Sequence, residues 1–434
     1  MRVKDNIKTN TQGKLKNINY DKHFSNIVLV NQSLNFGAWD YYKHAGLTYV
    51  DVQEIVGITG ACENVDTLFK VQNRLSLPLF MTQTGQLSLE QSLQSFHGAF
   101  TVIHSGRDEE VEDERHLRQF RLTEEEFDCT FANMTRKNYD EEKMFEALLN
   151  HIQASIQSMI KNVLKNNEGV LKNDYGRNIK ALKEASEKNF LRIEYGEAVK
   201  LLNKNGFPKL AFGDDLISEH EAKIVHLLNK SKGELPVFIM KYPKEIKFFN
   251  MKVSEKDTRV VLSADLILPY AGEATGSAVR EHDFEKLNER LKTSKMYELH
   301  IKRGGKYTDF TWYLDIVKGN KTLPHAGYGI GNERVLQYIF AESDIRNTSL
   351  FSLLDIKTGN WSPKRYGQAG IIENPKKHIL LSIGRDKNKK LLLSYIKLLS
   401  KNKSFVLYAT ENTHKFLAKN KVLSSMVYKI SELG

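Results

Sequence analysis

The sequence predicts an α+β fold, in which helices flank a mostly antiparallel sheet and a small βαβ unit follows towards the C-terminus. Strand-like runs recur without the regular strand–helix alternation that a doubly wound parallel sheet requires. A strand–helix–strand order appears only after residue 375. The strand-like runs in the larger part of the chain lie at 77–83, 98–104, 236–241, 259–268, 297–302 and 310–317.

The helical patterns and a change of composition predict the domain limits. An amphipathic helix is expected at Leu34–Lys43. A longer one is expected at Glu141–Leu164, where apolar residues at helical spacing indicate core packing. Gly, Pro, Asn and Lys then mark a linker. The predicted division is a basic N-terminal arm over 1–24, a large mixed domain over 25–355, a linker over 356–375 and a small domain over 376–434.

Composition narrows the classes of ligand and compartment. The formal net charge of +11 favours anionic ligands such as a nucleotide, a phosphate group or RNA, although lysines scattered over helical faces would give the same total. Cys62 and Cys129 make neither a disulfide framework nor a metal-ligand set, so we expect both to be reduced. No apolar run reaches membrane-spanning length and no signal peptide is recognisable. We therefore expect a cytoplasmic protein without membrane association.

The most informative motif is HAGYGIGNERVLQYI at 325–339. Gly327, Gly329 and Gly331 alternate before an apolar helical run, and glycine permits close approach of backbone to a ligand. Arg334 would lie on the first turn of that helix, where a guanidinium stacks on a heterocycle. A plain strand-to-helix corner is the alternative.

Two further stretches carry charged residues that suit a nucleotide and its metal. In SGRDEEVEDERHLRQF, Arg107, Arg115 and Phe120 bracket an acidic run; guanidinium groups suit phosphate oxygens, and the alternative is a solvated loop. In DLILPYAGEATGSAVRE, Asp265 and Glu273 offer hard oxygen ligands of the kind that Mg²⁺ requires. A strand-end carboxylate and an ion pair are the alternative there.

Together these stretches resemble class II aminoacyl-tRNA synthetases, and most closely the asparaginyl branch of the aspartyl/asparaginyl group. The run from Arg107 to Phe120 looks like motif 2 of that class, and Gly327 to Arg334 looks like motif 3. The resemblance covers roughly residues 30 to 345 and implies that family's antiparallel sheet. The other matching stretches are TGQLSLEQ, DDLISEHE, YPKEIKFFNM and WYLDIVKGNKTLPHAGYGIGNER.

The resemblance implies an adenylate-forming ligase that uses ATP and Mg²⁺, with Arg107, Arg334 and Glu273 in catalytic roles. Its implied ATP-binding residues are Arg107, Glu109, Arg115, His116, Phe120, Gly331 and Arg334. Asp265 and Glu273 would hold the metal. The implied amino-acid pocket consists of Glu63, Gln86, Glu90 and Arg280.

The identity of the amino acid depends on Leu89 and Glu90. The aspartyl branch has a lysine where this chain has Leu89. Glu90 would accept hydrogen bonds from a carboxamide and repel a carboxylate, so we favour asparagine over aspartate. The alternative is that Glu90 is a solvent-facing helix residue.

Several differences from the family's usual sequence bear on the acceptor that we expect. The chain begins almost directly at the catalytic core, and its short polar arm cannot form an anticodon-binding OB-fold. Ala278 and Val279 replace polar residues beside the substrate pocket, which suggests an altered substrate or acceptor. Gln53 replaces the motif 1 proline and weakens, without removing, the expectation of a homodimer.

The C-terminal stretch resembles the first half of a methylglyoxal-synthase-like domain. That resemblance implies phosphate binding by Lys387, Thr410 and Thr413. A small βαβ appendage without a ligand is the alternative.

Three functions remain open. The first is a ligase that transfers activated asparagine to an acceptor without anticodon-dependent tRNA recognition, for example by forming an amide with a small amine. The second is a tRNA ligase that reads only the acceptor stem. The third is a non-enzymatic regulator that senses nucleotide.

Overall fold

The computed structural model describes residues 20–57, 67–74, 79–109, 113–230, 233–302, 304–320, 322–349, 377–401 and 405–427. The chain divides into two compact units, which we call unit 1 (Met1–Ser362) and unit 2 (Pro363–Gly434). The predicted linker over 356–375 lies outside the described residues and stays a prediction, as does most of the N-terminal arm.

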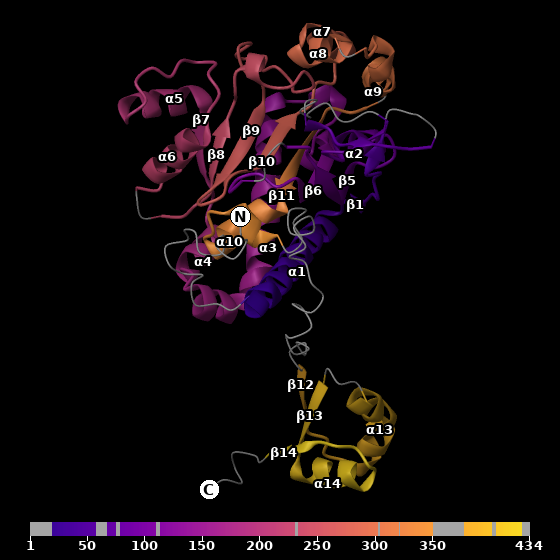
Figure 1. Ribbon diagram of the computed structural model, residues 1–434. Helices are drawn as coiled ribbons and strands as arrows, with labels where there is room; N and C mark the ends of the chain where they lie inside the picture. Colours follow the sequence, from indigo (N-terminus) through magenta and orange to yellow (C-terminus); the bar gives the residue numbers. More distant parts are fainter. Residues whose placement is uncertain are drawn as a thin grey trace. The chain divides into compact units, whose positions relative to one another are not determined.

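Unit 1 is built on an eight-stranded, mostly antiparallel sheet with helices against it, which confirms the α+β class (Figure 1). The strand order is β1-β5-β6-β11-β10-β9-β8-β7, and β1 with β5 and β7 with β8 are its parallel pairs. The strands are β1 (Thr48–Tyr49), β5 (Gly98–Gly106), β6 (Gln119–Asp128), β7 (Leu191–Glu194), β8 (Val237–Met240), β9 (Ser263–Leu268), β10 (Gly272–Val279) and β11 (His325–Gly331). A second sheet pairs β2 (Ile55–Val56), β4 (Leu79–Met81) and β3 (Lys70–Val71).

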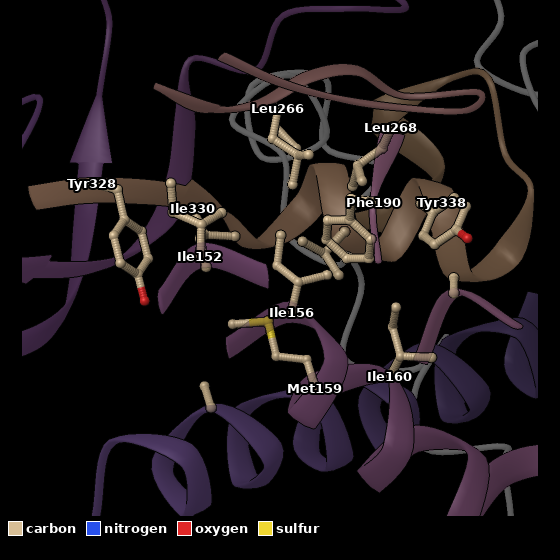
Figure 2. Close-up of a cluster of buried hydrophobic side chains, with 14 of the residues drawn as sticks. Ile152, Ile156, Met159, Ile160, Phe190, Leu266, Leu268, Tyr328, Ile330 and Tyr338 are labelled. Atoms are coloured by element: carbon tan, nitrogen blue, oxygen red, sulfur yellow. The ribbon is translucent and has the colours of Figure 1, made fainter. Parts of the chain in front are cut away.

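Two long helices, α1 (Tyr20–Ala45) and α3 (Glu141–Tyr175), pack against each other and bury the main core beneath the sheet (Figure 1). Figure 2 shows Ile152 and Ile156 of α3 near Leu266 of β9 and Ile330 of β11. Both helices are longer than predicted, because α1 begins at Tyr20 rather than at residue 34 and α3 continues past residue 164. They approach most closely at Gly37, where an added Cβ would lie 2.6 Å from the carbonyl oxygen of Ser158.

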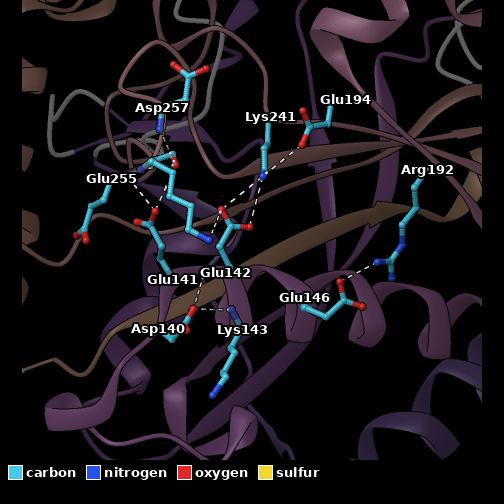
Figure 3. A network of polar contacts seen from close by, with 12 residues as sticks. Asp140, Glu141, Glu142, Lys143, Glu146, Arg192, Glu194, Lys241, Glu255 and Asp257 are labelled. Carbon is cyan, nitrogen blue, oxygen red and sulfur yellow. Dashed lines mark hydrogen bonds and ion pairs between the residues drawn. The ribbon is translucent and has the colours of Figure 1, made fainter.

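Charged residues fix the first turns of α3 to the edge of the sheet (Figure 3). The Asp140 side chain accepts hydrogen bonds from the backbone N–H groups of Glu142 and Lys143. Lys241 lies 3.4 Å from Glu142 and 3.3 Å from Glu194 of β7. This network places β7 and β8 relative to the helix that carries the core.

The remaining helices of unit 1 lie around the sheet, and two of them occupy segments that were predicted to be strands. The predicted strands at 297–302 and 310–317 are the helices α8 (Lys295–Lys302) and α9 (Thr311–Val317). Apolar residues spread over six to eight positions fit a short helix as well as a strand, and α9 buries its apolar side beside α7 (Phe284–Thr293). The others are α2 (Gln86–Ser92), α4 (Ile179–Glu187), α5 (Tyr195–Lys204), α6 (Ser218–Leu228), α7 (Phe284–Thr293) and α10 (Asn332–Phe340).

Unit 2 contains the predicted strand–helix–strand unit and extends it by a second helix and a third strand. Its parallel sheet has the order β12-β13-β14, with a small core of its own. The elements are β12 (Lys377–Leu381), α13 (Asp386–Lys401), β13 (Phe405–Thr410), α14 (Glu411–Lys419) and β14 (Ser425–Val427).

Candidate active site

A cavity of about 530 Å³ lies over the central strands of the large sheet. Arg107 and Arg334, which are far apart in the sequence, both line it. The seven residues predicted to bind ATP all line this one cavity: Arg107, Glu109, Arg115, His116, Phe120, Gly331 and Arg334. The fold therefore brings motifs separated by two hundred residues to one site.

Arg107 lies at the turn between β5 and β6, just after Gly106. Its backbone N–H donates to the Arg118 carbonyl at 2.9 Å, which fixes the turn. Its guanidinium lies 5.6 Å from the centre of the Phe120 ring. The Nε atom is buried and has no hydrogen-bond partner among the described residues. A buried, unpartnered guanidinium N–H facing a cavity suits an anionic ligand.

Arg334 is held from the opposite side by backbone oxygens. It lies on the first turn of α10, directly after β11 ends. Its Nη1 donates to the Ala271 carbonyl and its Nη2 to the Arg115 carbonyl, both at 2.6 Å. These bonds hold the guanidinium plane in place beside the cavity. A planar cation held in this way suits stacking on a nucleotide base.

Three carboxylates gather at one end of the cavity. Asp265 and Glu273 were predicted; Glu221 on α6 was not, although the stretch that contains it matched the family. Burial and the neighbouring Asp265 raise the pKa of Glu273 to about 7, even though its side chain remains accessible from the cavity. Burial likewise raises the pKa of Glu221. Such mutual repulsion between carboxylates is relieved by a divalent cation, and carboxylate oxygens are donors of the kind that Mg²⁺ prefers.

Lys247 is a second residue of this cluster that the sequence did not reveal. Its ammonium group lies 2.6 Å from Asp265 and 4.0 Å from the centre of the Tyr242 ring. Burial alone would lower the pKa of Lys247, but Asp265 and Glu273 raise it. One fixed cation thus neutralises part of the charge of the three carboxylates.

The predicted amino-acid pocket adjoins these groups. Gln86 and Arg280 line the cavity, whereas Glu90 lies behind them and is 1% exposed. Glu90 is therefore not a solvent-facing helix residue. Its oxygens contact Gln86 at 2.5 Å, Tyr313 at 3.0 Å and His325 at 3.1 Å. Burial would raise the pKa of Glu90, but His325 and Arg280 hold it below its usual value.

Glu126 on β6 completes this half of the site and was missed in the sequence. Its carboxylate pairs with Arg280 at 2.5 Å. Burial raises the pKa of Glu126 to about 7; Glu90 adds to this rise and Arg280 opposes it. Glu90, Glu126 and His325 offer ligand atoms within 4.8 Å of one another, but the adjacent Arg280 already supplies the positive charge that a metal would bring. The signal was present in the run EEE, which pairs with the alternating glycines.

Other predicted residues have different surroundings from those expected. His116 lies at the cavity, yet its ring contacts Asp113 at 3.0 Å. Ala278 and Val279 are fully buried in core clusters rather than exposed to the cavity, so these two departures do not change its lining. Glu63 and Cys62 lie outside the described residues.

In unit 2 the three residues predicted to bind phosphate are Lys387, Thr410 and Thr413, and the structure shows the surroundings of each. Thr410 and Thr413 are neighbours, with hydroxyl oxygens 3.4 Å apart. Lys387 is exposed, whereas Lys389 is buried and lies 3.5 Å from the Asn412 carbonyl beside these threonines. Helical phase explains the difference in burial between the two lysines, because residue 389 faces the sheet. Phosphate binding here stays a prediction.

Crossing a bilayer requires a helix that is both long and apolar, and the described helices of both units can be judged on these two properties. None of them combines the necessary length with sufficient apolar character.

Comparison with known proteins assigns the family. The family model for class II tRNA synthetases (D, K and N) matches residues 22–355. The chain belongs to this family. Its members are ATP-dependent ligases that form aminoacyl-adenylates, in agreement with the groups that line the cavity.

Similar proteins within the class II family include asparagine–tRNA ligases. The enzyme of Clostridium botulinum is 28% identical over 350 residues, covering 76% of this chain and 70% of that protein. The cytoplasmic enzyme of Saccharomyces cerevisiae is 31% identical over 314 residues, and the match spans 69% of this chain and 50% of the yeast protein. Asparaginyl-tRNA synthetase from Pyrococcus horikoshii, complexed with asparaginyl-adenylate, superimposes with a TM-score of 0.65 at 27% identity, over 76% of this chain and 68% of that chain.

Proposed function

We propose that this protein activates asparagine with ATP as an aminoacyl-adenylate and transfers it to a tRNA. The observation that carries the proposal is the convergence of Arg107, Arg334 and the carboxylates Asp265 and Glu273 on one cavity beside Arg280. The similar proteins named asparagine–tRNA ligases support the amino acid and the acceptor.

The residues perform distinct tasks in this reaction. An amino-acid carboxylate oxygen forms a bond to the α-phosphorus of ATP, and the bond from that phosphorus to pyrophosphate breaks. Arg107 stabilises the negative charge that grows on the phosphoryl oxygens, while Arg334 and Phe120 position the adenine. Asp265, Glu273 and Glu221 would hold Mg²⁺, which when bound neutralises phosphate charge.

Asparagine is favoured over aspartate on electrostatic grounds. Glu90 lies behind the residues that line the pocket, but it stays ionised because its pKa is held low, and its charge disfavours a second carboxylate in that pocket. Arg280 does not reverse this preference, because its guanidinium is already shared by two carboxyl groups, Glu126 at 2.5 Å and Glu90 at 3.9 Å. A neutral carboxamide meets no such repulsion.

The decisive experiment measures ATP–pyrophosphate exchange by the purified protein with each amino acid in turn. We expect exchange with asparagine and much less with aspartate. Charging of labelled asparagine onto total tRNA then tests the acceptor. The protein could instead catalyse pyrophosphate exchange, charge no tRNA, and form an amide product when a small amine is added. That result would make the amine, and not tRNA, the acceptor. If the protein binds ATP but shows no pyrophosphate exchange with any amino acid, its remaining candidate function is that of a nucleotide-sensing regulator.

Homodimerisation belongs to the same proposal. Phe36 and Trp39 of α1 and Tyr49 of β1 are exposed aromatic residues on one side of unit 1, with Trp39 and Tyr49 in ring contact. Exposed aromatic clusters of this kind are typical of protein interfaces. Light scattering of the protein and of Trp39→Glu tests it, and a monomeric wild-type protein would contradict it.

A further inference from the structure

The two units differ sharply in charge. Unit 2 holds 15 of the 64 lysines and arginines but 4 of the 53 acidic residues, which gives it a formal charge of +11. Unit 1 holds the remaining 49 basic and 49 acidic residues and is formally neutral. The entire net charge of the chain therefore lies in its smaller unit. Such an asymmetry is a physical signal for an anionic partner.

Much of this charge lies on one side of α13. Lys387, Lys390, Lys397 and Lys401 are exposed there. Within the described part of unit 2, the two acidic residues already have partners, because Asp386 pairs with Lys389 and Glu411 with Lys415. The four exposed lysines of α13 have no carboxylate partner among the described residues of this unit.

Apolar side chains lie beside the lysines. Leu391, Tyr395 and Leu398 recur at helical spacing and are 72%, 66% and 71% exposed. Lysines and an aromatic ring on the exposed side of one helix form a combination with which proteins contact a nucleic acid, because the cations meet phosphates and the ring stacks on a base. A basic amphipathic helix also suits an anionic membrane surface, which makes the membrane the competing partner.

We infer that unit 2 is an RNA-binding module whose contact surface is the exposed side of α13, with Lys390 and Lys397 meeting phosphates and Tyr395 meeting a base. The identification of this RNA as tRNA rests on the proposed function. RNA is favoured over a membrane because unit 1, which contains the ligase cavity, has no net charge with which to attract a polyanionic substrate. The net attraction of the chain for a polyanion therefore comes from unit 2.

The test uses the full chain, total tRNA as the probe, and a pair of matched variants. Lys390→Glu/Lys397→Glu reverses two exposed lysines seven residues apart on α13. Lys165→Glu/Lys172→Glu reverses two exposed lysines with the same spacing on α3 of unit 1. Fluorescence anisotropy measures tRNA affinity over a series of salt concentrations, and circular dichroism checks folding. Lys390→Gln/Lys397→Gln, which removes charge without reversing it, is a second variant in case the first fails to fold.

We expect the α13 variant to bind tRNA at least tenfold more weakly than wild type. The slope of log affinity against log salt should become shallower by about 1.5, since each phosphate contact contributes about 0.7 to 0.9. The α3 variant should bind like wild type, and all variants should retain pyrophosphate exchange. Tyr395→Ala should weaken binding without changing the salt slope, because it removes stacking rather than charge.

Three results separate this inference from the proposed function. Equal tRNA binding by the wild type and the α13 variant would overturn the inference. Binding of the wild type to phosphatidylcholine vesicles containing phosphatidylserine, with none to tRNA, would overturn it in favour of a membrane. The third result has two parts: the α13 variant binds tRNA more weakly than the wild type, and the wild type shows no pyrophosphate exchange. This result would support the inference and remove the proposed ligase activity.

Discussion

Gly327 of β11 lies directly opposite Glu126 of β6, and the absence of a side chain at 327 makes room for the glutamate. The two residues are register partners in the antiparallel pair. A Cβ added at residue 327 would overlap the Glu126 carboxyl group. Gly329 stands in the same relation to Glu124, with 3.3 Å between the added Cβ and an Oε atom. The alternating glycines thus admit acidic side chains to the floor of the cavity.

Replacement of this glycine should therefore affect both stability and activity. Gly327→Ala must displace Glu126 and separate it from Arg280. We expect a loss of about 1–3 kcal/mol in the free energy of unfolding, typical of overpacking, and a strong loss of asparagine-dependent exchange. Urea unfolding and the exchange assay measure the two effects. Gly57→Ala is a suitable control, because an added Cβ there meets nothing within 4 Å. An active, equally stable Gly327→Ala protein would contradict the role of this pairing.

Arg107→Ala should strongly slow adenylate formation while leaving the protein folded. No hydrogen bond from the Nε atom is lost, because that atom has no partner among the described residues. Removing one preorganised donor to a developing oxyanion costs about 10²- to 10³-fold in rate. Pyrophosphate exchange and thermal unfolding, measured side by side, test this. If the variant kept full exchange, the phosphates would have to bind elsewhere.

Glu90→Gln should change the choice between asparagine and aspartate. The substitution removes the negative charge that disfavours an aspartate side chain but keeps a side chain of similar size among Gln86, Tyr313 and His325. We expect the ratio of exchange rates to move towards aspartate by about tenfold, equivalent to about 1.4 kcal/mol. The ratio of kcat/KM values is the quantity to measure. An unchanged ratio would mean that Glu90 is structural and that specificity lies in other residues.

Glu221→Gln tests whether the third carboxylate takes part in holding Mg²⁺. Loss of its charge should raise the Mg²⁺ concentration needed for half-maximal exchange by about tenfold, with little effect on the rate at saturating Mg²⁺. Chelation of divalent cations should stop exchange in every variant. Glu219→Gln, on the same helix, is more exposed and does not line the cavity, so it serves as the control. Identical Mg²⁺ requirements in the two variants would exclude Glu221 from the metal site.

The sequence predicted the ATP half of the site more fully than the rest. Arg107, Phe120 and Arg334 stand in motifs whose order and local turns are set by nearby residues. Glu126, Glu221 and Lys247 were missed because they join the cavity through strand pairing and packing between distant segments, which local patterns do not reveal. The same limit applies to Lys389, whose burial near Thr410 and Thr413 depends on the phase of α13 against the sheet that it covers. It also explains α8 and α9, whose short apolar patterns fit either a strand or a helix.

The buried Glu126 should make the stability of the protein depend on pH. Its pKa is raised to about 7 in the folded state, against about 4.3 for an unperturbed glutamate. Between these values the folded state binds more protons than the unfolded state, so the free energy of unfolding should fall as the pH rises through this window. Glu126→Gln removes one titrating group and should make the decline shallower. Some decline in the free energy of unfolding with rising pH should remain in this variant, because the pKa of Glu273 is also raised to about 7. Urea unfolding at several pH values, with the exposed Glu289→Gln as control, measures the slopes. A Glu126→Gln slope equal to that of the wild type would show that Glu126 is already ionised at acidic pH, and its pairing with Arg280 would then outweigh its burial.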